Sequence, residues 1–382
     1  MSNSLHDDAL NLHKEHNGKI SIHLKTPIET KEDLSLVYTP GVAEVSRHLA
    51  AHPEETNEYT WRGRCVAVIS DGSAVLGLGN IGPEGAYPVM EGKCALFKRF
   101  AGLDAVPILL NTQDPDEIIR TVQHIAPSFG AINLEDISAP RCFYIEEQLK
   151  KTLNIPTIHD DQWGTAVVVY SGLLNACKVV GKNISDLKIV VNGVGAAGSA
   201  IVKILHHNGV HNILACDSTG IIFGGREGNS EHKESIASIS NPEKISGSLQ
   251  DAAKGAYILI GVSKANLFTK EMIQFMSKDA IVFALANPSP EIMPDDAKAT
   301  GVAIIATGRS DFPNQVNNAL GFPGIFKGVL DAGITTVNLD MLTKAAVALS
   351  DVIQNPDTEH IIPSVFDEHV VLAIAESISR KV

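Results

Sequence analysis

The chain has 382 residues, 44% hydrophobic and 20% charged, a balance typical of a globular protein large enough for two domains. Its formal net charge of −13 argues against nucleic acid or an anionic membrane as a partner. The five cysteines are odd in number and lack C-x-x-C spacing, which predicts buried thiols in a reducing compartment rather than disulfides or a zinc site. The N-terminus is polar, and no apolar run approaches the roughly 20 residues of a membrane helix, so we expect a cytoplasmic protein.

The first half of the chain alternates short apolar runs with helical patterns, after a polar, histidine-rich stretch over residues 1–60. We expect strands over residues 65–70, 106–111, 131–134 and 155–159, and helices over residues 88–100, 115–125 and 143–153. This alternation predicts a parallel sheet in an α/β layer. A match to G-x-G-x-x-G over residues 77–82 is followed by Pro83, so we expect neither a helix start nor a nucleotide site there.

An apolar segment over residues 165–180 predicts a long helix between the halves, and the alternation then restarts. We expect strands over residues 188–192, 212–217, 257–261, 280–286 and 303–306, a helix over residues 197–207, and amphipathic helices at the C-terminal end. The predicted fold class is therefore α/β in two domains. Residues 1–160 form an N-terminal α/β domain, and residues 161–382 form a Rossmann-type, doubly wound dinucleotide-binding domain.

Adjacent carboxylates end two of the apolar runs, with Glu135 and Asp136 after one strand and Asp160 and Asp161 after another. Buried charges need partners, so two such ends side by side would direct several carboxylates at one point. Hard oxygen ligands in that number suit Mg²⁺ or Mn²⁺. Each acid could instead cap a helix, and the pattern alone leaves both interpretations open.

A second match to G-x-G-x-x-G lies between a predicted strand and a predicted helix, as a dinucleotide site requires. The expected cofactor-binding residues are Gly193, Val194, Gly195, Ala196, Ala197 and Gly198. The alternative is a tight strand–helix turn without a ligand. Asp217 ends the next strand, where a carboxylate would accept the ribose hydroxyls of NAD and repel the 2′-phosphate of NADP. The next cations are Arg226 and Lys233, so we expect NAD to be preferred unless Arg226 folds back over the site.

Several further side chains have an ordinary alternative. Lys93 lies in an apolar helical segment and could be a surface lysine. Tyr38, before Thr-Pro-Gly, could be a packed loop aromatic. Asn287 and Asn318 would suit a carboxylate substrate if they faced the cofactor crevice, although turns use asparagine as readily.

Taken together and in order, these segments resemble the malic enzymes, specifically the short bacterial type without an acetyltransferase-like extension. The resemblance rests on the tyrosine motif (residues 37–42), the glycine-rich signature (70–80), the lysine motif (91–93), the metal motifs (134–136 and 159–166), the cofactor loop (192–198) and two amide segments (286–288 and 317–318). One departure is that larger malic enzymes carry an arginine within the glycine-rich signature, where this chain has Ser73 and Ala74.

The resemblance implies metal-assisted oxidative decarboxylation of L-malate to pyruvate and CO₂ with reduction of NAD, through bound oxaloacetate and enolpyruvate. The implied roles are metal ligation by Glu135, Asp136 and Asp161, hydrogen-bond support by Asp160, general base and substrate contact by Lys93, proton donation by Tyr38, cofactor and malate binding by Asn287, and malate binding by Asn318. Burial and the cation would leave Lys93 neutral. A homodimer is expected. The alternatives are malolactic conversion with retained NAD and a non-catalytic nucleotide-binding regulator.

Overall fold

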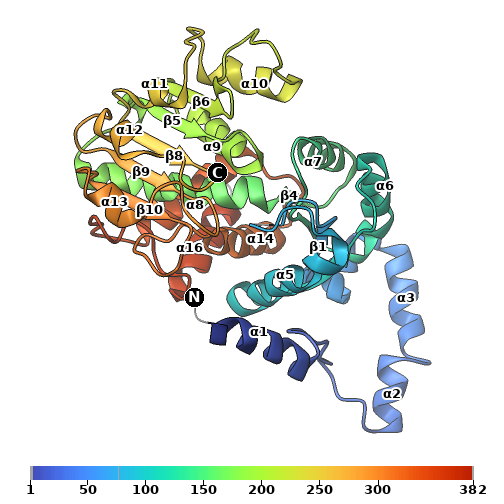
Figure 1. Ribbon diagram of the computed structural model, residues 1–382. Coiled ribbons are helices and arrows are strands. Elements are labelled where there is room, and N and C mark those ends of the chain that lie inside the picture. The colour runs from blue at the N-terminus through green and yellow to red at the C-terminus, as the bar shows by residue number, and fades with distance from the viewer. Residues whose placement is uncertain (1–2, 76, 381–382) are drawn as a thin grey trace.

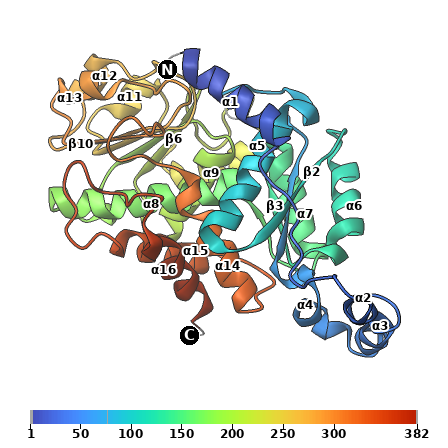
Figure 2. The same ribbon diagram turned by 90° about the horizontal axis from the view of Figure 1, so that it is seen from below.

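The computed structural model describes residues 3–75 and 77–380, which form two sheets covered by helices (Figures 1 and 2). The first sheet has the order β2-β1-β3-β4, with all neighbours parallel. Its strands are β1 (Cys65–Ser70), β2 (Asp104–Leu109), β3 (Ala131–Leu134) and β4 (Thr157–His159). The two central strands, β1 and β3, are buried along their whole length, as expected for a sheet covered on both faces. The predicted α/β layer is confirmed.

The helices of this half are α5, α6 and α7, and one of them corrects the sequence analysis. Their bounds are α5 (Gly82–Leu96), continued by the π-helical turn η3 (Phe97–Ala101), α6 (Pro115–Ile125), η4 (Ala126–Ser128) and α7 (Arg141–Thr152). The expectation that no helix starts near Pro83 is wrong, because α5 begins at Gly82 with proline in its first turn. The missing N–H of proline costs nothing in that turn, where backbone donors have no helical partner.

The second sheet has the order β7-β6-β5-β8-β9-β10. Its strands are β5 (Ile189–Asn192), β6 (Ile213–Asp217), β7 (Gly220–Ile221), β8 (Ile258–Gly261), β9 (Ile281–Ala284) and β10 (Ile304–Thr307). If the strands of this half are numbered in chain order, with β5 as the first, their order across the sheet is 3-2-1-4-5-6. This is the doubly wound order of dinucleotide-binding domains. Only the short edge strand β7 is antiparallel to its neighbour. The predicted Rossmann-type domain is confirmed.

Helix α8 (Asp160–Val180) starts directly after β4 and runs from the first sheet alongside the second (Figure 1). It begins five positions before the predicted start, so Asp160 and Asp161 lie in its first turn. Among the described residues it is the one helix long and apolar enough to cross a membrane, contrary to the expectation that no such run exists. However, 72% of the apolar 18-residue stretch of this helix is buried inside the protein, as in the core helix of a globular fold.

The helices of the second half include α9 (Ala196–His207), which packs on α8. The C-terminal helices are α14 (Phe322–Asp331), α15 (Leu339–Asp351) and α16 (Glu368–Ser379). The shorter helices are η5 (Ile184–Asp186), α10 (Glu231–Ser240), α11 (Leu249–Ala253), α12 (Lys270–Gln274), α13 (Pro294–Lys298) and η6 (Asn318–Leu320). The two halves share one hydrophobic core, because Phe97 packs edge-on against Phe322 and Phe326 at centroid distances of 4.7 and 5.1 Å.

The N-terminal helices form an arm with no buried residue between positions 5 and 64. Its helices are α1 (Asn3–His16), α2 (Lys31–Val37), α3 (Val42–Ala51), η1 (Pro53–Glu55), α4 (Thr56–Tyr59) and η2 (Trp61–Arg64). In both ribbon views α2 and α3 project from the rest of the chain (Figures 1 and 2). The sequence analysis described this stretch as polar and histidine-rich, and it predicted neither these helices nor their extended placement.

Candidate functional site

The two carboxylate pairs meet at one edge of the first sheet. Because β3 and β4 are adjacent and parallel, their carboxyl ends lie side by side. Glu135, Asp136 and Asp161 each direct a carboxylate oxygen to within 4.8 Å of the others. Helix capping does not explain Asp160 or Asp161, because the cap of α8 is His159 and makes no side-chain cap hydrogen bond. Three carboxylates in this arrangement fit the oxygen ligation that Mg²⁺ and Mn²⁺ prefer.

Lys93 reaches this cluster from α5 and is 7% exposed, so its interpretation as a surface lysine is wrong. Its Nζ lies 2.8 Å from Glu135 Oε1 and 2.7 Å from Asp160 Oδ2, and 4.1 Å from the ring centre of Phe322. Burial alone would lower the pKa of Lys93, but the charges of Asp160 and Glu135 outweigh it and raise the pKa. The expected neutral Lys93 depends on a bound cation as well as on burial, so it stays a prediction.

Further side chains hold the carboxylates in place. Asn318 Nδ2 donates to Asp160 Oδ2 at 2.6 Å, which ties the second half of the chain to the first. Asp161 Oδ2 accepts from the backbone N–H of Asp136 at 2.8 Å and lies 3.1 Å from His159 Nε2. Burial raises the pKa of Glu135 and of Asp160. Burial acts the same way on Asp161, but hydrogen bonding to His159 holds its pKa below the ordinary value.

Two supporting residues were not singled out from the sequence. His159 is fully buried and partners Asp161. Asn133 donates from Nδ2 to Glu135 Oε2 at 2.9 Å. Asn133 interrupts an apolar run and His159 ends a short strand just before two acids, and these positions are the signal that could have found them.

The glycine loop has the strand–turn–helix geometry of a dinucleotide site. It follows β5, and α9 begins at Ala196 with Gly195 at its cap. Gly193 takes φ 108°, a left-handed conformation that favours glycine. A Cβ at Gly198 would lie 1.7 Å from the carbonyl oxygen of Gly193, whereas a Cβ at Gly195 would meet no described atom within 4 Å. At Gly198 the first turn of α9 therefore packs tightly against the backbone of Gly193. At Gly195 the loop is open, and a pyrophosphate could approach there.

One cavity of about 660 Å³ connects the carboxylates to this loop. Its lining includes Asp136, Asp161, Gly195, Ala196, Ala197, Asn287 and Asn318, together with Ser73, Ala74 and Asn317. The wall of this cavity therefore contains residues that the sequence analysis expected to bind the metal, the cofactor and the substrate. Residue Leu76 of the glycine-rich signature lies outside the described residues.

Tyr38 is not brought to this cavity. It lies at the end of α2, is 65% exposed, and belongs to the projecting arm. No described residue before Ser73 lines the cavity. Asp217 does lie beside the glycine loop, since Gly193 N donates to Cys216 O at 2.9 Å, but Arg226 and Lys233 both contact its carboxylate.

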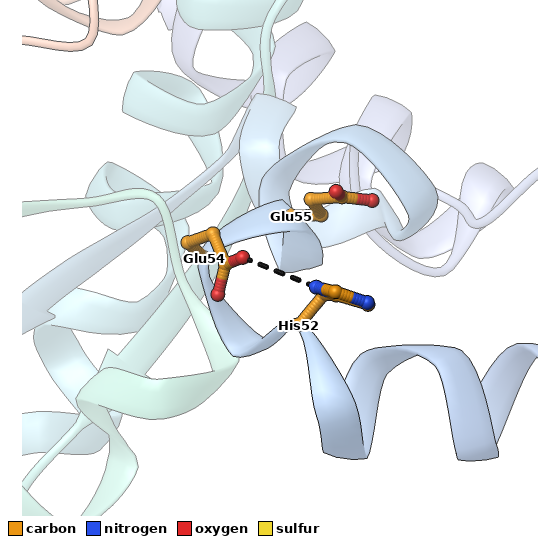
Figure 3. A group of neighbouring side chains, drawn as sticks. All are labelled: His52, Glu54 and Glu55. Atoms are coloured by element: carbon orange, nitrogen blue, oxygen red, sulfur yellow. Dashed lines mark ion pairs between the residues drawn. The ribbon is translucent and has the colours of Figure 1, made fainter.

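A second group of possible metal ligands, His52, Glu54 and Glu55, lies on the arm (Figure 3). His52 Nδ1 is 3.4 Å from Glu54 Oε1, and His48 Nε2 is 2.6 Å from Glu55 Oε2. His52 and Glu54 are exposed, and neither they nor Glu55 line the cavity between the carboxylates and the glycine loop. Ordinary surface ion pairs explain the arrangement.

Comparison with known proteins agrees with this geometry. The family model of the malic enzyme N-terminal domain matches residues 17–150, and that of the malic enzyme NAD binding domain matches residues 163–382. The chain belongs to the malic enzyme family. It is 51% identical to the bifunctional malic/malolactic enzyme of Bacillus subtilis over 380 residues, which cover 99% of this chain and 93% of the relative.

Other members of the family differ in the cofactor that their names give. The chain is 44% identical to the NADP-dependent malic enzyme of Escherichia coli over 401 residues, spanning 52% of that longer protein. Its fold matches the crystal structure of the NAD-dependent malic enzyme of Thermotoga maritima with a TM-score of 0.94 at 50% identity, over 97% of this chain and 98% of that one.

Gly198→Ala and Gly195→Ala should separate packing from cofactor binding. Gly198→Ala places a methyl group against the Gly193 carbonyl, so we expect the melting temperature to fall by roughly 5 °C or more. Gly195→Ala should keep the melting temperature and weaken dinucleotide binding, because only a ligand would meet the added methyl. Thermal unfolding and calorimetric titration with NAD measure both effects. Equal losses of stability in the two variants would contradict this account of the loop.

Proposed function

We propose that this chain oxidises L-malate at C2 and decarboxylates the product to pyruvate and CO₂, with reduction of a nicotinamide cofactor. One observation carries the proposal: Asp136 and Asp161 line the same cavity as Gly195 and Asn287. A metal-bound hydroxy acid and a nicotinamide ring could therefore meet there. The membership in the malic enzyme family supports the same reaction.

Glu135, Asp136 and Asp161 would hold the Mg²⁺ or Mn²⁺ that the reaction needs. When bound, the cation supplies a Lewis acid for the C2 oxygen and positive charge that lowers the pKa of Lys93. Asp160 would act through hydrogen bonds, because its Oδ2 already accepts from Lys93 and Asn318.

Lys93 is the group we propose to accept the proton of the C2 hydroxyl. Its Nζ is fixed between Glu135 and Asp160, at the edge of the cluster that would receive the substrate. Asn318 and Asn287 line the cavity and offer amide donors to the substrate carboxylates, and Asn287 could also contact the nicotinamide half of the cofactor. These donors would replace the arginine that is absent at Ser73 and Ala74.

Tyr38 can take its proposed role, proton donation to the enolate, only if another copy of the chain supplies it. The arm exposes many apolar side chains, namely Ile22, Leu24, Leu34, Leu36, Tyr38, Val42, Val45, Tyr59 and Trp61. Leu78 and Ile81 are likewise exposed beside Gly77 and Gly79 of the cavity wall. We propose a homodimer in which the arm of one copy covers this apolar rim of the other and brings Tyr38 to Lys93.

The five cysteines support a reducing compartment, and we propose the cytoplasm. All five are buried and free in the structure. Burial raises the pKa of four of them, Cys65, Cys94, Cys177 and Cys216, to about 12, which leaves thiols of low reactivity.

The function is tested by incubating the protein with L-malate, Mn²⁺ and NAD while following the absorbance of the reduced nicotinamide. We expect reduced cofactor and pyruvate to form in equal amounts. Lactate without net cofactor reduction would instead identify the malolactic reaction, which is part of the name of the Bacillus relative. Cofactor binding without any conversion of malate would identify a non-catalytic regulator.

Asp161→Asn should weaken metal binding while the fold is kept. Asparagine preserves the shape and a hydrogen bond but removes one anionic ligand, so the Mn²⁺ concentration for half-maximal activity should rise roughly 10–100-fold or more. The matched control is Glu54→Gln, which removes an acid from the exposed group on the arm and should change nothing. An unchanged Mn²⁺ titration in Asp161→Asn would remove this residue from the metal site.

Subunit complementation tests whether Tyr38 acts across a dimer. Tyr38→Phe and Lys93→Ala should each be nearly inactive, because each removes one proton-transfer group. Chains carrying one change each, unfolded together and refolded, should recover about a quarter of the wild-type activity, because random C2 pairing yields one intact site in each mixed dimer. No recovery in mixed dimers that sedimentation confirms would place both residues in one chain.

A further inference from the structure

The most informative cluster outside the reaction centre lies at the end of β6. Asp217 follows Cys216, whose carbonyl accepts from Gly193 N of the glycine loop. The expected preference for NAD required this carboxylate to stand alone. The structure overturns that premise: β7 turns the chain back along β6, and Arg226 and Lys233 both reach Asp217.

The oxygens of Asp217 are fully occupied. Oδ1 accepts from Arg226 Nη1 at 3.0 Å and from Thr219 N and Oγ1 at 2.9 and 2.8 Å. Oδ2 accepts from Arg226 Nη2 and, at 2.8 Å, from Lys233 Nζ. A carboxylate has about four lone-pair positions, and five donors already share them. No acceptor remains for the two ribose hydroxyls that an unpaired aspartate would bind.

The cluster also brings two cations to the end of β6. Burial would raise the pKa of Asp217, but hydrogen bonds from Arg226, Lys233 and Thr219 hold the pKa well below its usual range. The aspartate is therefore a full anion at neutral pH, and two cations face it. The Glu234 carboxylate also interacts electrostatically with Arg226, so Lys233 is the cation of this cluster whose ion pair, among the described residues, is with Asp217 alone, beside the position where the adenosine ribose of a dinucleotide would lie.

The surrounding contacts fix Lys233 beside the cofactor loop. Its neighbour His232 stacks on Phe143 at a centroid distance of 3.8 Å and shares a hydrogen bond of 2.7 Å with Ser199 in α9. The Glu234 carboxylate accepts from Gly225 N and Asn229 Nδ2, so it holds the turn that carries Arg226. The first turn of α10 is thus packed against the helix that would receive the pyrophosphate.

We propose that Arg226 and Lys233 form a binding site for the 2′-phosphate of NADP, so that this chain uses NADP about as well as NAD. The phosphate dianion would take Lys233 and part of the Arg226 guanidinium, and Asp217 would keep its two bonds from Thr219. Arginine and lysine are the usual partners of a phosphate at this position. Which reaction the dinucleotide serves rests on the proposed function; the phosphate site itself does not.

Lys233 is the better residue to test, because Arg226 also bonds Asn229, Gly220 and Ile221 and its loss would disturb the turn. Lys233 is 32% exposed, and no partner of its Nζ other than Asp217 is seen in the described part of the chain. Lys233→Ala therefore removes one cation with little other change. Lys254→Ala is the matched control, since Lys254 makes a comparable ion pair with Asp251 on the surface.

The test compares calorimetric binding of 2′,5′-ADP and 5′-AMP, which share the 5′-phosphate at the pyrophosphate position and differ only in the 2′-phosphate. We expect the wild type to bind 2′,5′-ADP roughly tenfold or more tightly than 5′-AMP, as charged hydrogen bonds of this kind require. Lys233→Ala should lose most of that preference and keep its affinity for 5′-AMP, and Lys254→Ala should keep both. In parallel, kcat/KM with NADP should lie within about tenfold of that with NAD and fall selectively in Lys233→Ala.

Equal affinity of the wild type for the two nucleotides would overturn the proposal. So would an equal loss of both affinities in Lys233→Ala, because the cluster would then only brace the end of β6. Absence of malate turnover with a retained preference for 2′,5′-ADP would instead overturn the proposed reaction and leave the phosphate site standing.

Discussion

The buried ion pairs of Lys93 are the constraint on which the site depends. One cation from α5 meets Glu135 after β3 and Asp160 at the start of α8, and Asn318 adds a donor from the second half of the chain. Without Lys93, two buried carboxylates would lose their nearest counter-charge, which is costly in a desolvated site. These contacts also fix the position of the cavity, because they hold α5, the end of β3 and the start of α8 against Asn318 of the second half.

Much of the site could be predicted because it depends on local sequence. Strands end where apolar runs end, so the residue pattern was enough to place Glu135 and Asp161 just beyond two strands. The glycine spacing after β5 could be interpreted in the same way, since strand, turn and helix all lie within residues 189–207. The parallel pairing of the strands followed from the alternation of strands and helices in both halves.

What could not be predicted depends on contacts between distant segments or on side-chain direction. Periodicity does not say that Arg226 turns back onto Asp217, because a two-residue strand and a glycine-rich turn decide it. The protonation of Lys93 depends on two carboxylates that are distant in sequence. The early start of α5 and α8 reflects first-turn residues, proline in one and adjacent acids in the other, that pattern analysis assigned to loops.

The edge-on stack of Phe97 on Phe322 and Phe326 has a consequence for how this chain could have been assembled. Two family models describe its halves separately, yet the aromatic rings that close the first half belong to a helix near the end of the second. The two halves therefore complete one part of their core together. Phe97 lacks these two aromatic partners until α14 has been synthesised, so part of the shared core stays uncovered while the second half is being made.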